Sequence, residues 1–258
     1  MLSFLQGLAG LAILIALSQP ALAIEDRADV DPSLAPSAGK ALAWKATYGL
    51  YRNSLEGQAR DVNLRGNTKD LTFWLGSYKD AQDFEQHRAG LEYALALPVG
   101  KLTPSLQWAT GGFFGWSLTW NGLSEQAEGL APLLGLGRTN QKTYYNLNFD
   151  PNDSVMLGAS YASSSVGLLM LYRIQDDRLH TGQRNHHLVW RKSLQEGLRL
   201  TVDLFHRRGA EEAGLPIYQG RGASVTLDLG DYFVRIGRDP KANYAPGDIS
   251  RLAVGWKF

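Results

Sequence analysis

The sequence predicts an all-β fold: a transmembrane antiparallel up-and-down β-barrel, with 12 strands expected and 14 as the upper limit. Three observations predict it: an alternation of apolar and polar residues from Leu42 onward, turn-forming residues between the alternating segments, and an aromatic residue at the chain end. The absence of cysteine among the 258 residues excludes disulfide scaffolds and thiolate metal sites. Lys and Arg (26) nearly balance Asp and Glu (25), which leaves no basic footprint for nucleic acid.

The beginning of the chain predicts export. Residues 1–23 have the pattern of a signal peptide, because Leu8 to Leu17 is an apolar run too short to span a membrane and Ala21-Leu22-Ala23 is a small-residue cleavage site. No Lys or Arg precedes the apolar run, so an interfacial anchor helix is the alternative. Residues 24–41 are rich in Asp, Pro, Ser and Ala and are expected to form a flexible periplasmic leader, followed by the barrel over 42–258.

The period of two indicates strands with one apolar face and one polar face. No uncharged apolar run after Ala23 is long enough for a membrane helix, whereas a membrane barrel spreads its lipid-facing residues over alternate positions. Segment 121–141 interrupts the alternation, and a short helix or a plug-like loop is expected there. The clearest strands are 44–50, 89–97, 145–149, 198–204 and 223–229, and turn residues occupy 66–69, 98–100, 150–153, 163–165 and 230–231.

Aromatic residues on the apolar phase favour a membrane barrel over a soluble barrel or sandwich. Rings with one apolar and one polar edge form girdles where the bilayer meets water. An ordinary aromatic core is the alternative explanation. The residues assigned to this phase are Trp44, Trp74, Tyr78, Trp108, Trp116, Trp120, Tyr172, Trp190 and Trp256.

The last eight residues, RLAVGWKF (251–258), place Leu252, Val254, Trp256 and Phe258 on one face. Here the sequence resembles bacterial outer-membrane β-barrel proteins, whose last strand ends in Phe or Trp. The resemblance implies an outer-membrane location with lipid around the barrel, and implies that these four residues are read by the barrel-assembly machinery. It is specific over 249–258; the remaining chain shares only the alternation, and a looser similarity to small oligosaccharide porins with a basic lumen rests on no motif.

The resemblance also places Phe258 at the periplasmic end, which orients the connections. Segments 176–185, 208–216 and 239–248 then lie outside the cell, and 163–165, 193–197 and 230–231 are periplasmic turns. The same parity puts 121–141 on the periplasmic side, which is unusual for a long segment and is the sign of a miscounted strand.

The polar phase predicts a basic lumen. Rings of Arg and Lys in a pore favour anions, so the expected function is a small channel for anionic solutes, such as anionic oligosaccharides or small organic acids. The expected basic residues are Lys45, Arg88, Arg173, Arg199, Arg207, Arg235, Arg251 and Lys257, and the expected acidic partners are Glu92, Asp203 and Asp228.

Three other functions stay open at this stage. Inward Arg residues that pair with the acids would fill a non-conducting structural or interaction barrel. A basic interior also suits an accessory barrel in polysaccharide export. An outer-membrane lipid-modifying enzyme would need His87, His187 and His206 on the outward phase, but no Ser of matching phase accompanies them, so no catalytic, cofactor or metal site is predicted.

Overall fold

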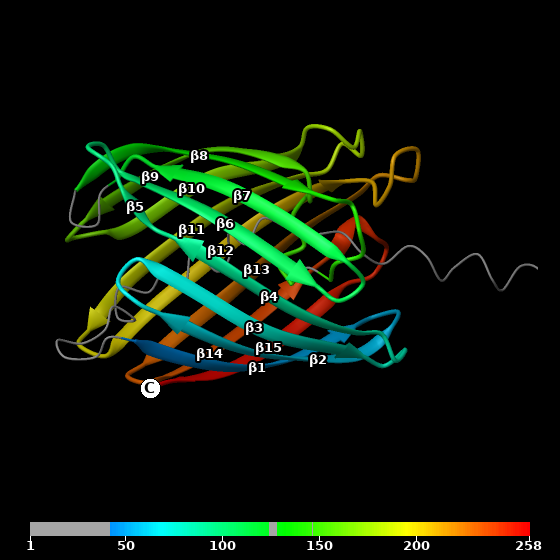
Figure 1. The fold of residues 1–258 in the computed structure, drawn as a ribbon, viewed down its shortest axis with the longest axis horizontal. Helices are drawn as coiled ribbons and strands as arrows, with labels where there is room; N and C mark the ends of the chain where they lie inside the picture. The colour runs from blue at the N-terminus through cyan, green and yellow to red at the C-terminus, as the bar shows by residue number, and fades with distance from the viewer. Residues whose placement is uncertain (1–41, 124–127, 146) are drawn as a thin grey trace, which may run out of the picture.

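The computed structural model describes residues 42–123, 128–145 and 147–258, which form one closed antiparallel β-barrel (Figure 1). The predicted signal peptide and leader lie outside the described residues. Strands incline to the barrel axis, and the C terminus lies at the same end of the barrel as the start of β1 (Ala43–Asn53) (Figure 1). Following the orientation predicted from Phe258, we call this end the periplasmic end and the opposite end the outer end. Among the described residues, no helix is long and apolar enough to cross a bilayer.

The barrel wall has 14 strands, more than the 12 expected and at the upper limit of the prediction. β4 and β5 flank Ala94 and both pair with β6, so they act as one strand of the wall. The ends of the chain close the sheet, because β1 pairs with β15 from Lys45 opposite Lys257 to Asn53 opposite Ile249. The remaining strands are β2 (Gly57–Asn67), β3 (Leu71–Asp80), β4 (Glu85–Tyr93), β5 (Leu95–Ala96), β6 (Lys101–Ala109), β7 (Phe113–Asn121), β8 (Gly129–Thr139), β9 (Ser154–Ser163), β10 (Gly167–Asp176), β11 (Arg184–Gln195), β12 (Leu198–Gly209), β13 (Tyr218–Leu229), β14 (Tyr232–Asp239) and β15 (Ile249–Lys257).

The prediction for segment 121–141 was wrong over most of its length, because β8 occupies Gly129–Thr139. Leu130 and Leu134 are exposed on the outer face, whereas Ala131 and Leu133 are buried in the lumen. Apolar residues on both faces hide the alternation that identifies the other strands. The extra strand accounts for the miscount: the connection between β7 and β8 lies at the periplasmic end, and its residues 124–127 are outside the described part.

The prediction of a strand over 145–149 was also wrong, whereas residues 150–153, predicted as turn residues, lie in the connection that precedes β9. Residues 140–145 and 147–153 lie in the connection from β8 to β9 at the outer end of the barrel, and we call them the inward loop. Tyr145, Phe149 and Asp150 are almost fully buried although they belong to no strand. Burial does not alternate along the loop, because Tyr144 is buried beside Tyr145 and all of residues 149–153 are buried; the aromatic residues alternate in the sequence without forming a strand.

The outer surface is the apolar face predicted from the alternation. Leu75, Leu157 and Leu171 are each about 60% exposed on the outer face of the barrel. Such a broad exposed apolar surface is typical of a barrel whose outer face contacts the acyl chains of a bilayer. Trp120 and Trp190 donate hydrogen bonds from their indole nitrogens to the carbonyl oxygens of Val99 and Val166 near the periplasmic end. Trp44, Trp108, Trp116, Trp120, Trp190 and Trp256 are outward, as expected.

Three of the aromatic residues assigned to the lipid face point inward instead. Trp74, Tyr78 and Tyr172 are 5%, 2% and 4% exposed and contact other lumen side chains. The prediction placed every large ring on the lipid-facing side of its strand. A 14-stranded wall, however, leaves an interior wide enough for these three rings.

Gly90 makes room for one of these inward rings. A Cβ added at Gly90 would lie 2.1 Å from a ring carbon of Trp74, which stands opposite it on β3. The guanidinium of Arg65 lies over the same ring, 5.3 Å from its centroid. The missing side chain at Gly90 therefore permits a packed aromatic–cation layer inside the wall.

We expect Gly90→Val to reduce the fraction of protein that folds into the compact barrel, because overpacking costs about 1–3 kcal/mol. Folded and unfolded barrel are separated by gel mobility with and without boiling. The double variant Gly90→Val with Trp74→Ala should regain folded protein. Equal folding of the single variant and the original sequence would contradict the packing described.

Candidate functional site in the barrel lumen

The lumen receives ten of the eleven charged residues that the sequence analysis assigned to it. The exception is Arg173, which lies on the outer face, between the inward-pointing Tyr172 and Ile174. Its phase was misassigned because β10 carries large apolar side chains on both faces. The residues inside are Lys45, Arg88, Arg199, Arg207, Arg235, Arg251 and Lys257, with Glu92, Asp203 and Asp228.

The sequence analysis missed several charged lumen residues. Arg65 and Arg191 point inward from β2 and β11, and Asp61 and Asp239 point inward from β2 and β14. The signal was present for Asp61 and Arg65, which alternate with the outward Val62 and Leu64. Small and polar residues throughout β2 make that alternation weak.

The outer half of the lumen is filled by the inward loop. The Tyr145 ring stacks on Tyr78 of β3 with ring centroids 3.7 Å apart. The Tyr145 backbone N–H donates to Gln86 Oε1 at 2.7 Å, and Arg88 Nη1 donates to the Tyr145 carbonyl oxygen at 3.3 Å. The loop is therefore bound to β3 and β4 by both stacking and buried hydrogen bonds.

A second set of contacts binds the loop to the opposite wall through Asp150. Asn185 Nδ2 donates to Asp150 Oδ1 at 2.7 Å, and His187 Nε2 lies 3.4 Å from the same oxygen. Nδ1 of His187 lies 3.0 Å from Asp203 Oδ1, and its ring stacks on Tyr172. Each of these side chains is at least nine-tenths buried. We call Asp150, Asn185, His187 and Asp203 the loop latch.

Buried ion pairs complete the outer half. Arg207 and Arg251 lie 3.2 Å and 3.3 Å from carboxylate oxygens of Asp239, and Arg88 pairs with Asp61. Nη1 of Arg207 and Nη1 of Arg251 also reach backbone carbonyl oxygens of the inward loop. A buried charge is costly unless it has a partner of opposite charge, and Asp239 and Asp61 are the partners of these three arginines.

The inner half of the lumen, toward the periplasm, has a different charge pattern. Lys45 stands directly opposite Lys257 on one side and Arg65 on the other, so three cations lie side by side on β15, β1 and β2. The Lys257 ammonium bonds Asp228 at 2.8 Å, and Arg199 reaches the same carboxylate at 3.0 Å. We call Lys45, Arg65, Arg191, Arg199, Arg235 and Lys257 the inner basic ring.

Aromatic rings stabilise two of these cations. The Lys45 ammonium lies 4.3 Å from the centroid of the Phe233 ring, and Arg65 lies over Trp74. Ring faces attract cations by about 0.5–1 kcal/mol or more when water is excluded. The inner half thus combines positive charge with flat apolar surface.

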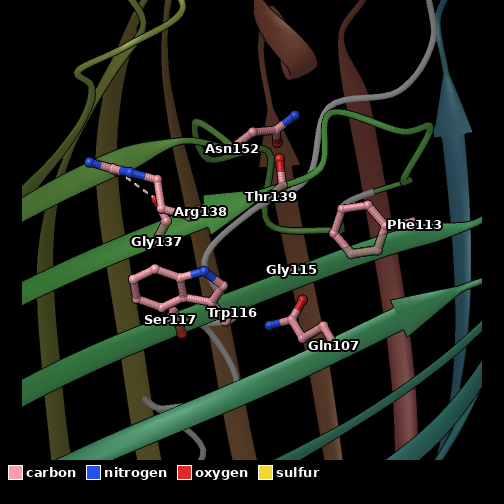
Figure 2. A pocket seen from close by; sticks show the side chains of 9 residues that line it. All are labelled: Gln107, Phe113, Gly115, Trp116, Ser117, Gly137, Arg138, Thr139 and Asn152. Carbon is pink, nitrogen blue, oxygen red and sulfur yellow. Dashed lines mark hydrogen bonds between the residues drawn. The ribbon is translucent and has the colours of Figure 1, made fainter.

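Figure 2 shows a small crevice where β7 and β8 meet Asn152 of the inward loop. Phe113 and Gln107 line one side, and Arg138 and Thr139 line the other. Its empty volume is about 210 Å³, part of it open to solvent, which is below the usual size of a ligand pocket. The crevice therefore separates the loop from the wall without forming a binding cavity.

The histidines required by the lipid-enzyme alternative do not share one face. His87 and His206 are outward, but His187 is inside the lumen in the loop latch, so its predicted outward placement was wrong. On β11 the outward phase is Arg184, His186, Leu188 and Trp190. The geometry offers that alternative no converging nucleophile and base in the described residues.

A titratable carboxyl group lies in the connection between β12 and β13 at the outer mouth. Burial, together with the negative charges of Glu212 and Glu56, raises the pKa of Glu211 to about 7. Gln183 of the preceding connection donates to the Ala210 and Glu211 carbonyl oxygens and holds this segment at the mouth.

We expect the packing of residues 210–217 to weaken as the pH rises. Below pH 4.5, the ordinary pKa of Glu, the carboxyl group of Glu211 is protonated whether the segment is packed or released. Between pH 4.5 and about 7 the group ionises more easily in the released segment than in the packed one, so the free energy that favours packing decreases as the pH rises. A spin label on Ala213→Cys, in a chain without native cysteine, should become more mobile from pH 5 to pH 8. Glu211→Gln should remove that change; persistence in Glu211→Gln would assign it to another group.

Comparison with known proteins shows the fold. No protein-family model matches the sequence, and no curated protein matches it. Among solved structures, the chain is similar to the outer membrane protein Omp33 of Acinetobacter baumannii, with a TM-score of 0.50 and 8% identity over 83% of this chain and 97% of that one. Similarity to Salmonella typhi OmpF (TM-score 0.46, 12% identity, 84% and 97% coverage) and to the NanC porin (TM-score 0.46, 7% identity, 83% and 100% coverage) is weaker.

The predicted resemblance to outer-membrane β-barrel proteins is confirmed at the level of the fold. Closure of the sheet, the exposed apolar belt and the similarity to Omp33 agree on one conclusion: the chain has the fold of an outer-membrane β-barrel protein.

Proposed function

We propose that the protein is an outer-membrane channel that the inward loop narrows and that selects small anionic solutes by its inner basic ring. The outer half, with its paired charges, determines the width of the passage. The inner half, with its excess of cations, determines which charge enters. Carboxylated sugars and small organic acids are the solute classes that suit these features.

The row formed by Lys257, Lys45 and Arg65 carries the proposal. Like charges directly opposite on neighbouring strands destabilise a sheet, so the row has an energetic cost. The ion pair with Asp228 offsets part of this cost, and the contacts of Lys45 and Arg65 with the rings of Phe233 and Trp74 offset a further part. A cluster of positive charge on a lumen wall favours anion entry, which gives the cost a functional reason.

A non-conducting interaction barrel is the second candidate, and the packing at the outer mouth favours it. Tyr51, Tyr78, Tyr145, Phe149, Ala242 and Ile249 form one buried cluster that joins the inward loop to the connection between β14 and β15. Tyr244 of the short 3-10 helix η2 (Ala242–Tyr244) is 1% exposed in the same region. A barrel closed this tightly could present its outer loops without conducting.

Planar-bilayer recording of the folded protein tests the channel. We expect discrete conductance steps and, in a salt gradient, a reversal potential that indicates anion preference. Lys45→Gln with Arg235→Gln should move the reversal potential toward zero because it removes lumen charge. Arg52→Gln with Arg60→Gln removes the same charge from the outer face and should leave selectivity unchanged.

Absence of current from folded, reconstituted protein would contradict the channel and support the second candidate. Current with equal anion and cation permeability would contradict only the role of the inner basic ring.

The loop latch provides a separate prediction. Asp150→Ala leaves Asn185 and His187 without their shared acceptor and should weaken anchoring of the inward loop by about 1–3 kcal/mol. We expect larger or noisier conductance steps, with selectivity preserved. Asp83→Asn, at an exposed loop position, is the matched control. Unchanged current noise and step size in Asp150→Ala would show that the loop does not limit the passage.

A further inference from the structure

The lipid-facing surface carries a concentrated group of basic side chains, four Arg and two His, near the outer ends of β10 to β13. Register places Arg173 beside His186, His186 beside His206, and His206 beside Arg221, in one row across four strands. One row closer to the outer rim, Arg184 stands opposite Arg208. We call Arg173, Arg184, His186, His206, Arg208 and Arg221 the outer basic patch.

The depth of the patch follows from the rows beneath it. The next outward row toward the periplasm is Leu171, Leu188, Leu204 and Ala223, and the row after that is Leu169, Trp190, Val202 and Val225. Apolar side chains of this kind face acyl chains. The basic patch therefore begins where the apolar belt ends, at the level of the headgroups of the outer leaflet.

Among the described residues, the outward faces of the patch strands and of their neighbours carry no acid. The outward residues of the flanking strands are Val155, Leu157, Ala159 and Tyr161 on β9, and Tyr232, Val234, Ile236 and Arg238 on β14, with no carboxylate among them. Within the described part of the chain, none of the six patch residues forms an ion pair, and Nε of Arg173 is buried without a hydrogen-bond partner. The rings of His186 and His206 stack at 6.1 Å, which packs the middle of the row closely.

The other basic group on the outer face is different. Lys79 stands beside Arg60 but also opposite Glu85, and its ammonium lies 3.5 Å from Asp83. His87 lies 3.7 Å from Glu85. Lys79 and His87 therefore have intramolecular acidic partners, which none of the six residues of the outer basic patch has within the described part of the chain.

We propose that the outer basic patch binds the phosphate groups of a phosphorylated glycolipid in the outer leaflet. The planar guanidinium groups of Arg can bind phosphate oxygens with two hydrogen bonds each, and several cations in two rows suit a headgroup that carries more than one phosphate. The acyl chains of the same lipid would lie on the leucine rows below. The site needs both parts of one lipid, its phosphates and its chains.

The test is thermal unfolding of the full-length folded protein in detergent, followed by the loss of heat-modifiable gel mobility. The probes are a bisphosphorylated glycolipid with acyl chains, the same lipid without phosphates, and inorganic phosphate. We expect the phosphorylated lipid alone to raise the unfolding midpoint, by an amount that falls with added salt.

Arg173→Gln, Arg184→Gln, Arg208→Gln and Arg221→Gln together should weaken the apparent affinity by about 600-fold, since each cation near a charged lipid contributes about fivefold and the four contributions multiply. Arg60→Gln with Lys79→Gln is the matched control and should keep the affinity. Because the four substitutions lie on the outer surface, the variant should fold, and its own midpoint without lipid verifies that.

Several results would overturn the proposal. One is that the fourfold variant keeps its affinity for the phosphorylated lipid, and another is that the lipid without phosphates stabilises the protein equally. Equal stabilisation by inorganic phosphate would indicate a site for small anions instead. Self-association that the fourfold variant loses without any lipid present would assign the patch to a protein interface instead.

Discussion

Closure of the sheet is the constraint on which the rest of this structure depends. In lipid, each backbone N–H and C=O must find its partner within the protein, and a sheet with two free edges leaves two rows of such groups unpaired. The seam between β1 and β15 removes both edges, with Trp44 and Phe258 exchanging backbone hydrogen bonds at its end. Every side chain of the wall then faces either lipid or the lumen, and that division fixes where charge can be placed.

The buried charges of the lumen are compensated differently in its two halves. Near the outer mouth, the inward loop and the ion pairs of Arg88, Arg207 and Arg251 fill the space and satisfy each other. Near the periplasm, cations exceed acids and rest partly on aromatic rings. A narrow, neutralised outer section in series with a positive inner section is the arrangement from which the proposed selectivity follows. The outer surface shows a parallel division, with apolar rows below and a basic patch above.

Much of the fold could be predicted from the sequence because alternation is a strong signal wherever the two faces differ. In β13, Val225 and Leu227 alternate with Thr226 and Asp228, and the strand was correctly recognised. The alternation gave no signal where both faces of a strand are apolar, as with Leu133 and Leu134 in β8. It gave a false signal where aromatic residues alternate along a loop, as with Tyr145 and Phe149. The same ambiguity misplaced Arg173 and His187. The latch around Asp150 had no sequence signal, because its members come together only after the barrel closes.

The inward loop has a consequence for how the molecule is made. Its backbone is bound by Arg88 of β4 and by Arg207 and Arg251 of β12 and β15. β4 and β15 lie on opposite sides of the seam between β1 and β15. The loop therefore gains its full set of contacts only when the cylinder is closed, so that its docking reports completion of the wall.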